Sequence, residues 1–459
     1  MKAKPAIAIF DIGKTNKKLL LFDEDYNVLF QECRQFNEAV DEDGHPCEDV
    51  QVLTNWIRKS FLKIIGDDRF DIRAVNFSAY GASLVYVDET LTPILPLYNY
   101  LKPYPEALQR KFHSKYLGEE KLSECTASPS LGSLNSGLQL YRLKAQHPAK
   151  LKGVRYALHL PQYLSSIFTR LPYSDITSIG CHTKLWDFKA RNYHHWVDQE
   201  GLRSKLAPIL PGDTTFTVIK HGRPVQVGIG IHDSAAALIP YQLTFQNPFI
   251  LISTGTWCIS LNPFNTDPLT AAELKNDCLC YLAFDGKPVK ASRLFAGNEH
   301  EQQAKRLSRF FHQPLSYFER LKYSDQSIRR AAYINQLHRS YDNETLDFKN
   351  RDLEEFMECE VAYHQLIIDI VAKQLISTNL VQRQPKPKNV YIDGGFSKNN
   401  IYMNLMAAVF PDTNIYAASV AKASALGAAL AVHDRWNTKP IPSDLIQLER
   451  YCDRTMALK

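Results

Sequence analysis

The sequence predicts an α/β protein built from two similar halves, each with a mixed sheet flanked by helices. A strand–turn–strand pattern occurs twice: residues 6–10 and 19–22 flank one polar turn, and residues 249–252 and 257–261 flank another. Apolar residues recur at helical spacing over residues 361–380, which predicts a helix. The length of 459 residues fits two or three domains with sizeable cores.

The remaining elements follow from local patterns. Residues 74–78 and 389–392 are short apolar runs typical of buried strands, and they alternate with helical stretches as an α/β half requires. The Ala-rich segment 421–433, which contains Gly427, predicts a helix whose small face serves close packing more often than ligand binding.

A linker is expected between the halves. Residues 239–248 contain Pro240 and Pro248 and show no clear periodicity, so we place the boundary near residue 245. The expected domains are therefore residues 1–245 and 246–459, facing one another across a cleft.

Composition excludes several classes of protein. Hydrophobic residues make up 45% and charged residues 22%, the ordinary globular balance. A net charge of +5 without a long basic block gives no footprint for nucleic acid. The nine scattered cysteines indicate reduced thiols, since the C-x-C pair Cys278 and Cys280 lacks zinc-site spacing. Asp11 interrupts the first apolar run too early for a signal peptide or a membrane span, so we expect a cytoplasmic protein.

The first turn is a candidate phosphate site. Asp11 ends a strand and a polar turn with Gly13 follows, but no glycine stands where a Walker A loop would need one. A hairpin turn with outward N–H groups can instead cradle phosphate oxygens, while Asp11 holds a hydrated Mg²⁺. An ordinary exposed hairpin would explain the first turn alone. The second turn, residues 253–256, favours the phosphate hypothesis, because two facing turns can hold one triphosphate from both sides.

Two further motifs carry candidate residues. His232 and Asp233 begin an Ala-rich helical stretch, where the helix N-terminus favours an ionised carboxylate. A helix cap is the simpler reading of Asp233, but its position just before the expected linker favours a cleft residue. Gly394 and Gly395 follow a strand and would let backbone approach a flat ligand, although a tight turn explains them nearly as well.

The order of these four motifs resembles the FGGY carbohydrate kinases of the actin-like ATPase superfamily, and the match spans nearly the whole chain. The chain looks most similar to the rhamnulokinase and L-fuculokinase branch. The resemblance implies two actin-like (ribonuclease H-like) domains with the active site in the interdomain cleft. It further implies that ATP and Mg²⁺ are bound and that the γ-phosphoryl group passes to a hydroxyl of a ketose or deoxyketose.

Residue roles follow from the same resemblance. The N-terminal domain would hold the sugar, the metal and the catalytic base, and the C-terminal domain the nucleotide. Asp233 would be the base, and it and Asp11 would hold the metal. The sugar would meet Gly81, Ala82, His232, Asp233 and Ser234. The nucleotide would meet Lys14, Thr15, Asn16, Lys17, Thr254, Gly255, Thr256, Gly394 and Gly395.

The sequence departs from the family pattern in two places. Residues 98–102 stand where many relatives carry an acid and an arginine, which leaves the sugar contacts open. Residues 292–302 keep a glycine but little else of the usual pattern, so Arg293, Asn298 and Gln302 are candidates only.

Phosphoryl transfer depends chiefly on positioning and electrostatics, so an ordinary ionised carboxylate at Asp233 could accept the hydroxyl proton at neutral pH without an unusual pKa. Alternatives are a kinase for xylulose or a polyol, an actin-like ATPase acting on a protein partner, and an inactive sugar sensor. Relatives occur as monomers and homodimers, and the sequence favours neither.

Overall fold

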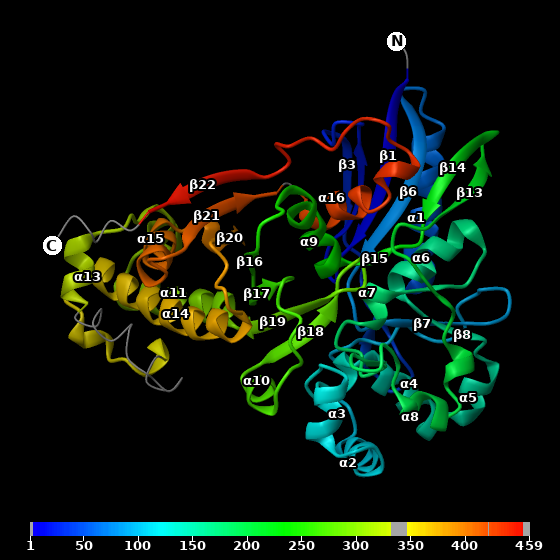
Figure 1. Ribbon diagram of the computed structural model, residues 1–459, viewed down its shortest axis with the longest axis horizontal. Coiled ribbons are helices and arrows are strands. Elements are labelled where there is room, and N and C mark those ends of the chain that lie inside the picture. Colours follow the sequence, from blue (N-terminus) through cyan, green and yellow to red (C-terminus); the bar gives the residue numbers. More distant parts are fainter. Residues whose placement is uncertain (1–2, 332–346, 421, 453–459) are drawn as a thin grey trace.

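The computed structural model describes residues 3–331, 347–420 and 422–452. It contains two large mixed sheets side by side (Figure 1). The first has the order β13 (Thr215–Lys220), β14 (Arg223–Gly228), β6 (Phe70–Ala79), β1 (Lys4–Ile12), β2 (Lys17–Phe22) and β3 (Val28–Arg34), and β15 (Ile231–His232) pairs in parallel with the end of β6. The second has the order β18 (Cys278–Leu282), β19 (Pro288–Leu294), β17 (Cys258–Asn262), β16 (Phe249–Thr254), β20 (Asn389–Gly394), β21 (Asn414–Ser419) and β22 (Gln447–Tyr451).

The two sheets repeat one design. β1 is antiparallel to β2 and parallel to β6, and β16 is likewise antiparallel to β17 and parallel to β20. The next strand outward is parallel in both sheets: β14 pairs with β6, and β21 pairs with β20. The edge strands β13 and β22 are antiparallel to β14 and β21. The duplicated hairpins predicted from sequence are therefore confirmed. Residues 74–78 and 389–392 form the expected strands, within β6 and β20.

Helices cover both sheets. The first half contains α1 (Val50–Ile65), α6 (Leu160–Thr169) and α9 (Asp233–Thr244), with a further group made of α2 (Glu106–Lys115), α3 (Glu119–Cys125), α4 (Ser136–Gln146), α5 (Pro148–Gly153), α7 (Ile176–Ile179) and α8 (His195–Gln199). The second half contains α10 (Ala271–Lys275), α11 (Ala296–Phe310), α12 (Leu315–Arg320), α13 (Asp325–Arg330), α14 (Cys359–Val381), α15 (Asn400–Val409) and α16 (Ala423–Leu430). Short ladders join β4 (Ala39–Val40) to β5 (Pro46–Cys47), β7 (Leu84–Val87) to β8 (Tyr156–His159), β9 (Ser174–Asp175) to β12 (Ile209–Leu210), and β10 (Trp186–Asp187) to β11 (Asn192–Tyr193).

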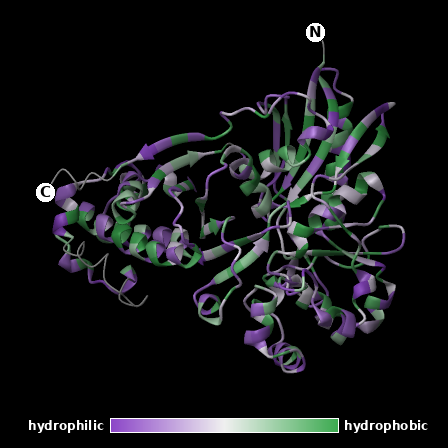
Figure 2. Cartoon of the chain, viewed as in Figure 1, coloured by the Kyte–Doolittle hydropathy of each residue, from purple (hydrophilic) through white to green (hydrophobic). Residues whose placement is uncertain are grey.

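The hydropathy of the helices and strands agrees with their positions in the fold. α14, the helix predicted over residues 361–380, is buried along most of its length, and Ser377 on it accepts a hydrogen bond from Ser292 of β19 at 2.7 Å. The edge strand β22 is hydrophilic (Figure 2), which discourages pairing with another chain. Within the described ranges, no helix combines the length and apolar character needed to cross a membrane. All nine cysteines are free thiols, as the sequence predicted.

The expected linker is wrong over residues 239–244, which belong to α9. Pro240 lies inside that helix, where it lacks the N–H that would bond the carbonyl of Ala236. Gly427 of α16 packs against this same carbonyl so closely that an added Cβ would lie 1.8 Å from it. The small face of α16 therefore serves packing against α9, as predicted. The predicted helix 421–433 is shorter in the structure, and its residue 421 lies outside the described residues.

Candidate active site

A pocket of about 460 Å³ lies between the two halves. The first half contributes Asp11, Lys18, Cys181, His182, His232, Asp233, Ser234, Ala237 and Leu238. The second half contributes Leu251, Ser253, Ile259, Leu261, Leu279, Tyr281, Ala291, Arg293, Lys422, Ala423 and Ser424. Carboxylates, cations and an apolar floor thus meet in one cavity, the arrangement expected of a site for a polar small molecule.

Asp233 is the first residue of α9 and projects into this pocket. Its Oδ1 accepts a hydrogen bond from the N–H of Ser234 at 2.6 Å, and its side chain is 33% exposed. Burial nevertheless raises the pKa of Asp233 to about 6, although the Ser234 hydrogen bonds oppose the rise. This pKa lies above that of an ordinary carboxylate, because the pocket wall desolvates the group more than the helix N-terminus stabilises it. At pH 7 the carboxylate is still mainly ionised.

Asp11 lies on the same pocket, at the end of β1. Its Oδ1 accepts a hydrogen bond from Ser424 at 2.9 Å, and its Oδ2 lies 3.5 Å from Lys18 Nζ. Burial raises the pKa of Asp11, and the charge of Asp233 adds to the rise, while Lys18 and Ser424 oppose it. Two carboxylates that repel each other across one cavity are the oxygen donors that Mg²⁺ prefers, so these residues fit the ion.

His232 is held as a neutral ring beside Asp233. Burial lowers the pKa of His232 to about 4, and its Nε2 lies 3.3 Å from Asp233 Oδ1. A Cβ at Gly81 would lie 2.6 Å from that same Nε2, so only glycine lets the loop after β6 pack on the ring. Ala82 follows with a positive φ of 59°. Of the predicted sugar-side residues, Gly81 and Asp233 therefore lie against His232, and the structure adds Cys181, whose Sγ lies 3.6 Å from Nε2 of the ring.

The lysines predicted in the first turn do not face this pocket. Lys14 pairs with Glu38 and Lys17 with Glu48, each at 2.6 Å, and the second pair is almost fully buried. Lys14, Thr15 and Lys17 line a separate cavity. Asn16 accepts a hydrogen bond from Gln35, and its carbonyl closes the turn onto the N–H of Gly13 at 2.9 Å.

The second predicted turn is bonded to its own half. Thr254 donates its hydroxyl to the carbonyl of Asp393 and accepts from the N–H of Phe396. A Cβ at Gly394 would lie 1.8 Å from the carbonyl of Thr254, and Gly297 is equally close to Gly255. Gly394 therefore serves a close backbone approach within the protein. Gly395 donates to the carbonyl of Thr254, and the carbonyl of Thr256 accepts from Asn298, so turn, loop and α11 form one unit.

Several pocket residues were missed from the sequence. Lys18 could have been found, because strand alternation turns it to the face opposite Lys17. Lys422 and Ser424 gave no signal, since their position depends on how α16 packs against the first half. Among the uncertain candidates, Arg293 lines the pocket, whereas Asn298 and Gln302 hydrogen-bond each other outside its lining.

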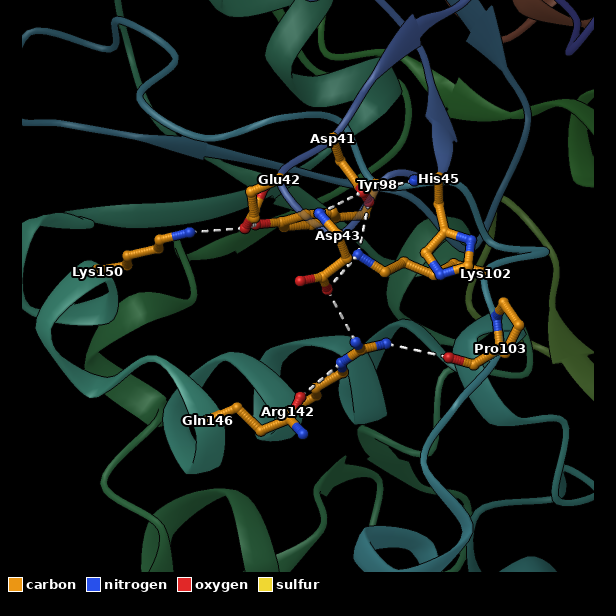
Figure 3. A network of polar contacts seen from close by, with 10 residues as sticks. All are labelled: Asp41, Glu42, Asp43, His45, Tyr98, Lys102, Pro103, Arg142, Gln146 and Lys150. Atoms are coloured by element: carbon orange, nitrogen blue, oxygen red, sulfur yellow. Dashed lines mark hydrogen bonds and ion pairs between the residues drawn. The ribbon is translucent and has the colours of Figure 1, made fainter.

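The divergent segment 98–102 divides between two surroundings. Burial raises the pKa of Tyr100, and the nearby charge of Asp233 raises it further, which places this residue beside the pocket. Lys102 instead enters a buried ion-pair network, 2.5 Å from Asp41 and 2.8 Å from Asp43 (Figure 3). Arg142 of α4 extends this network by contacting Asp43 at 3.1 Å. The lysine therefore ties its loop to the turn between β4 and β5, which Arg142 joins to α4, and it does not line the pocket.

Comparison with known proteins points to one family. A family model described as the N-terminal domain of the FGGY family of carbohydrate kinases matches residues 6–237, and one described as the carbohydrate kinase FGGY C-terminal domain matches residues 246–337. The rhamnulokinase of Mannheimia succiniciproducens is 24% identical over 274 residues, covering 55% of this chain and 52% of that protein. That of Halalkalibacterium halodurans is 23% identical over 261 residues, covering 54% of each. The chain thus spans about half the length of the curated relatives it matches.

Solved structures share the fold over nearly the whole chain. A carbohydrate kinase from Novosphingobium aromaticivorans has a TM-score of 0.77 at 21% identity and covers 97% of this chain and 96% of its own. A ligand-bound xylulose kinase from Lactobacillus acidophilus has a TM-score of 0.77 at 13% identity, covering 98% and 94%. The predicted two-domain α/β fold is therefore confirmed.

Proposed function

The chain belongs to the FGGY family of carbohydrate kinases, and from this premise we propose that it transfers the γ-phosphoryl group of ATP to a hydroxyl of a ketose or deoxyketose. The observation that carries the proposal is that Asp233 and Asp11 both line one pocket, which residues of both halves form. The similarity to rhamnulokinases favours a substrate of the L-rhamnulose or L-fuculose type. Xylulose and polyols are the nearest alternatives.

Asp233 is proposed as the general base. An ionised carboxylate can orient the sugar hydroxyl and accept its proton as the bond to phosphorus forms. His232, kept neutral, would contact the sugar, together with Gly81, Ala82 and Ser234. Its neutrality matters because an imidazolium 3.3 Å from Asp233 would lower the basicity of that carboxylate.

The metal site is proposed at Asp11, with Asp233 as its second carboxylate. When bound, Mg²⁺ would neutralise charge on the phosphate oxygens. Lys18 and Lys422 lie on the same pocket and would add positive charge there. Because the side chains of Lys14 and Lys17 are committed to carboxylates, we propose that residues 14–17 meet phosphate through backbone N–H groups. Thr254, Gly255 and Thr256 would do the same from the second half, and Gly394 and Gly395 would border the adenosine.

We further propose the division near residue 245 as the boundary between the sugar and nucleotide domains. The first large sheet ends before this point and the second begins after it, and the family matches end at residue 237 and resume at residue 246. α16 is an exception to a strict division, because it packs on α9 of the first half.

An ATP-consumption assay across ketoses, deoxyketoses and polyols tests the proposal. We expect sugar-dependent ADP release, highest for one ketose or deoxyketose, with the phosphorylated product identified by mass spectrometry. ATP hydrolysis that no sugar stimulates would overturn the proposal and favour an ATPase acting on a protein partner. Sugar binding without any ATP turnover would indicate a sensor.

A further inference from the structure

Arg293 stands out on the sheet face that floors the pocket. Along β19 the side chains alternate: Ser292 bonds to α14, whereas Ala291 and Arg293 line the pocket. The other lining residues of β16 to β19 are apolar apart from the hydroxyls of Ser253 and Tyr281: Leu251, Ser253, Ile259, Leu261, Leu279, Tyr281 and Ala291. An apolar residue at position 293 would pack on this face at a lower desolvation cost than arginine. Packing therefore does not explain the charge.

The guanidinium is only partly satisfied by the protein. Its one side-chain hydrogen-bond acceptor among the described residues is Asp277, whose Oδ1 accepts from a terminal nitrogen at 2.7 Å. Arg293 Nε is buried and lacks a hydrogen-bond partner in the part of the chain that the structure describes. The guanidinium carbon lies 5.3 Å from the ring centre of Trp257, within the range of a cation–π contact. Five N–H donors with one acceptor leave donor capacity beside the pocket.

We propose that Arg293 is a sugar-binding, specificity-determining residue contributed by the second half, donating hydrogen bonds to an oxygen of the substrate. This inference rests on the proposed kinase function. Arg293 lies on the sugar side of the pocket, whose lining it shares with His182, His232 and Asp233. Burial lowers the pKa of His182 to about 4, and the charges of His232 and Arg293 add to that effect. The rings of His182 and His232 lie edge to face, with their centres 6.5 Å apart.

The ion pair with Asp277 narrows the class of substrate. A guanidinium already facing one carboxylate offers less attraction to a second anion, so a neutral sugar oxygen suits it better than the carboxylate of an aldonate. Arginine has no acceptor, so it reads only the lone pairs of a carbonyl or hydroxyl. Substrate binding across the two halves would also make the sugar site complete only when both are in contact.

Steady-state kinetics of Arg293→Met and Arg293→Lys test this inference, with Asp277→Asn as the matched control. Arg293→Met should raise KM for the sugar about 10- to 100-fold while KM for ATP changes less than about twofold. Arg293→Lys should recover part of the loss, since it keeps a charged donor. Asp277→Asn should stay within about threefold of the parent, because Asp277 is 53% exposed and lies outside the pocket lining.

The outcomes separate this inference from the proposed function. An active parent enzyme whose sugar KM is unchanged in Arg293→Met would overturn the role of Arg293 alone. A raised KM for ATP instead would assign Arg293 to the phosphate, and an equal loss in Asp277→Asn would reduce it to a structural ion pair; either result overturns the inference. A parent that phosphorylates no sugar overturns the proposed function and this inference together. Thermal unfolding of each variant shows whether the fold is kept.

Discussion

Asp11 and Lys18 are direct cross-strand partners in the first hairpin, and their side chains lie 3.5 Å apart on the pocket between the halves. The preceding residue, Lys17, points to the other face of the strand and pairs with buried Glu48 at 2.6 Å. One step along β2 therefore separates a lysine that can meet a ligand from one that the fold uses internally.

This alternation predicts opposite effects for two neighbouring substitutions. Lys17→Met removes one partner of a buried ion pair and should destabilise the protein by about 3 to 5 kcal/mol. Lys18→Met removes a partly exposed charge and should change stability by less than about 1 kcal/mol, yet reduce kcat/KM for ATP about 10- to 100-fold. Chemical denaturation and ATP kinetics measure both quantities, and similar profiles for the two variants would contradict the assignment.

Asp233→Asn should separate catalysis from stability. We expect turnover to fall about 10²- to 10⁴-fold, because the sugar hydroxyl loses its proton acceptor. The melting temperature should rise, since burial disfavours the charged carboxylate and the neutral amide avoids that cost. Calorimetric titration should show ATP binding retained. Turnover near that of the parent enzyme would remove Asp233 from the role of base.

The pH profile should report the raised pKa of Asp233. A base works only when deprotonated, so kcat/KM for the sugar should be level above about pH 7 and fall about tenfold for each unit below about pH 6. Magnesium favours the ionised carboxylate, so a higher magnesium concentration should move the fall to lower pH. A midpoint near pH 4 at every magnesium concentration would argue against a desolvated base.

Gly427→Ala should disturb the contact between α9 and α16. The added Cβ would lie 1.8 Å from the carbonyl of Ala236, so the helices must separate, at a cost of about 1 to 3 kcal/mol. Turnover should fall as well, because α9 begins at Asp233. Gly153→Ala is the matched control: its Cβ meets Ile94 at an ordinary 3.7 Å, and its stability should stay within about 1 kcal/mol of the parent. Equal stability of both variants would show that the helix pair tolerates displacement.

Patterns local to the sequence predicted the architecture well. The two hairpins and the buried strands after them are apolar runs bounded by polar turns. This pattern lies within short stretches of the chain, so the sequence alone predicts these strands correctly. Asp233 was located because a carboxylate at the start of an Ala-rich helix is visible in the chain itself. Its raised pKa was not, because desolvation depends on residues from both halves that form the pocket wall.

Features that depend on distant partners escaped prediction. Pro240 suggested a linker, but the carbonyl it leaves without an N–H is covered by Gly427 of another helix. The lysines of the first turn suggested side chains that bind phosphate, but Lys14 forms an ion pair with Glu38 and Lys17 forms one with Glu48. Ser424 reaches Asp11 only because α16 docks on the first half.

The return of the chain to its first half has a consequence for biosynthesis. Ser424 donates to Asp11, the carbonyl of Ala428 accepts from Asn76, and His433 hydrogen-bonds Tyr26, so a late segment completes the surroundings of β1 and β6. Apolar residues of β1, β2 and β6 also share one cluster with those of α16. As the nascent chain emerges from the ribosome, these residues of the early half are therefore left uncovered until translation has nearly finished. A premature stop codon before this segment would yield a product prone to aggregation, even though Asp11 and Asp233 had already been made.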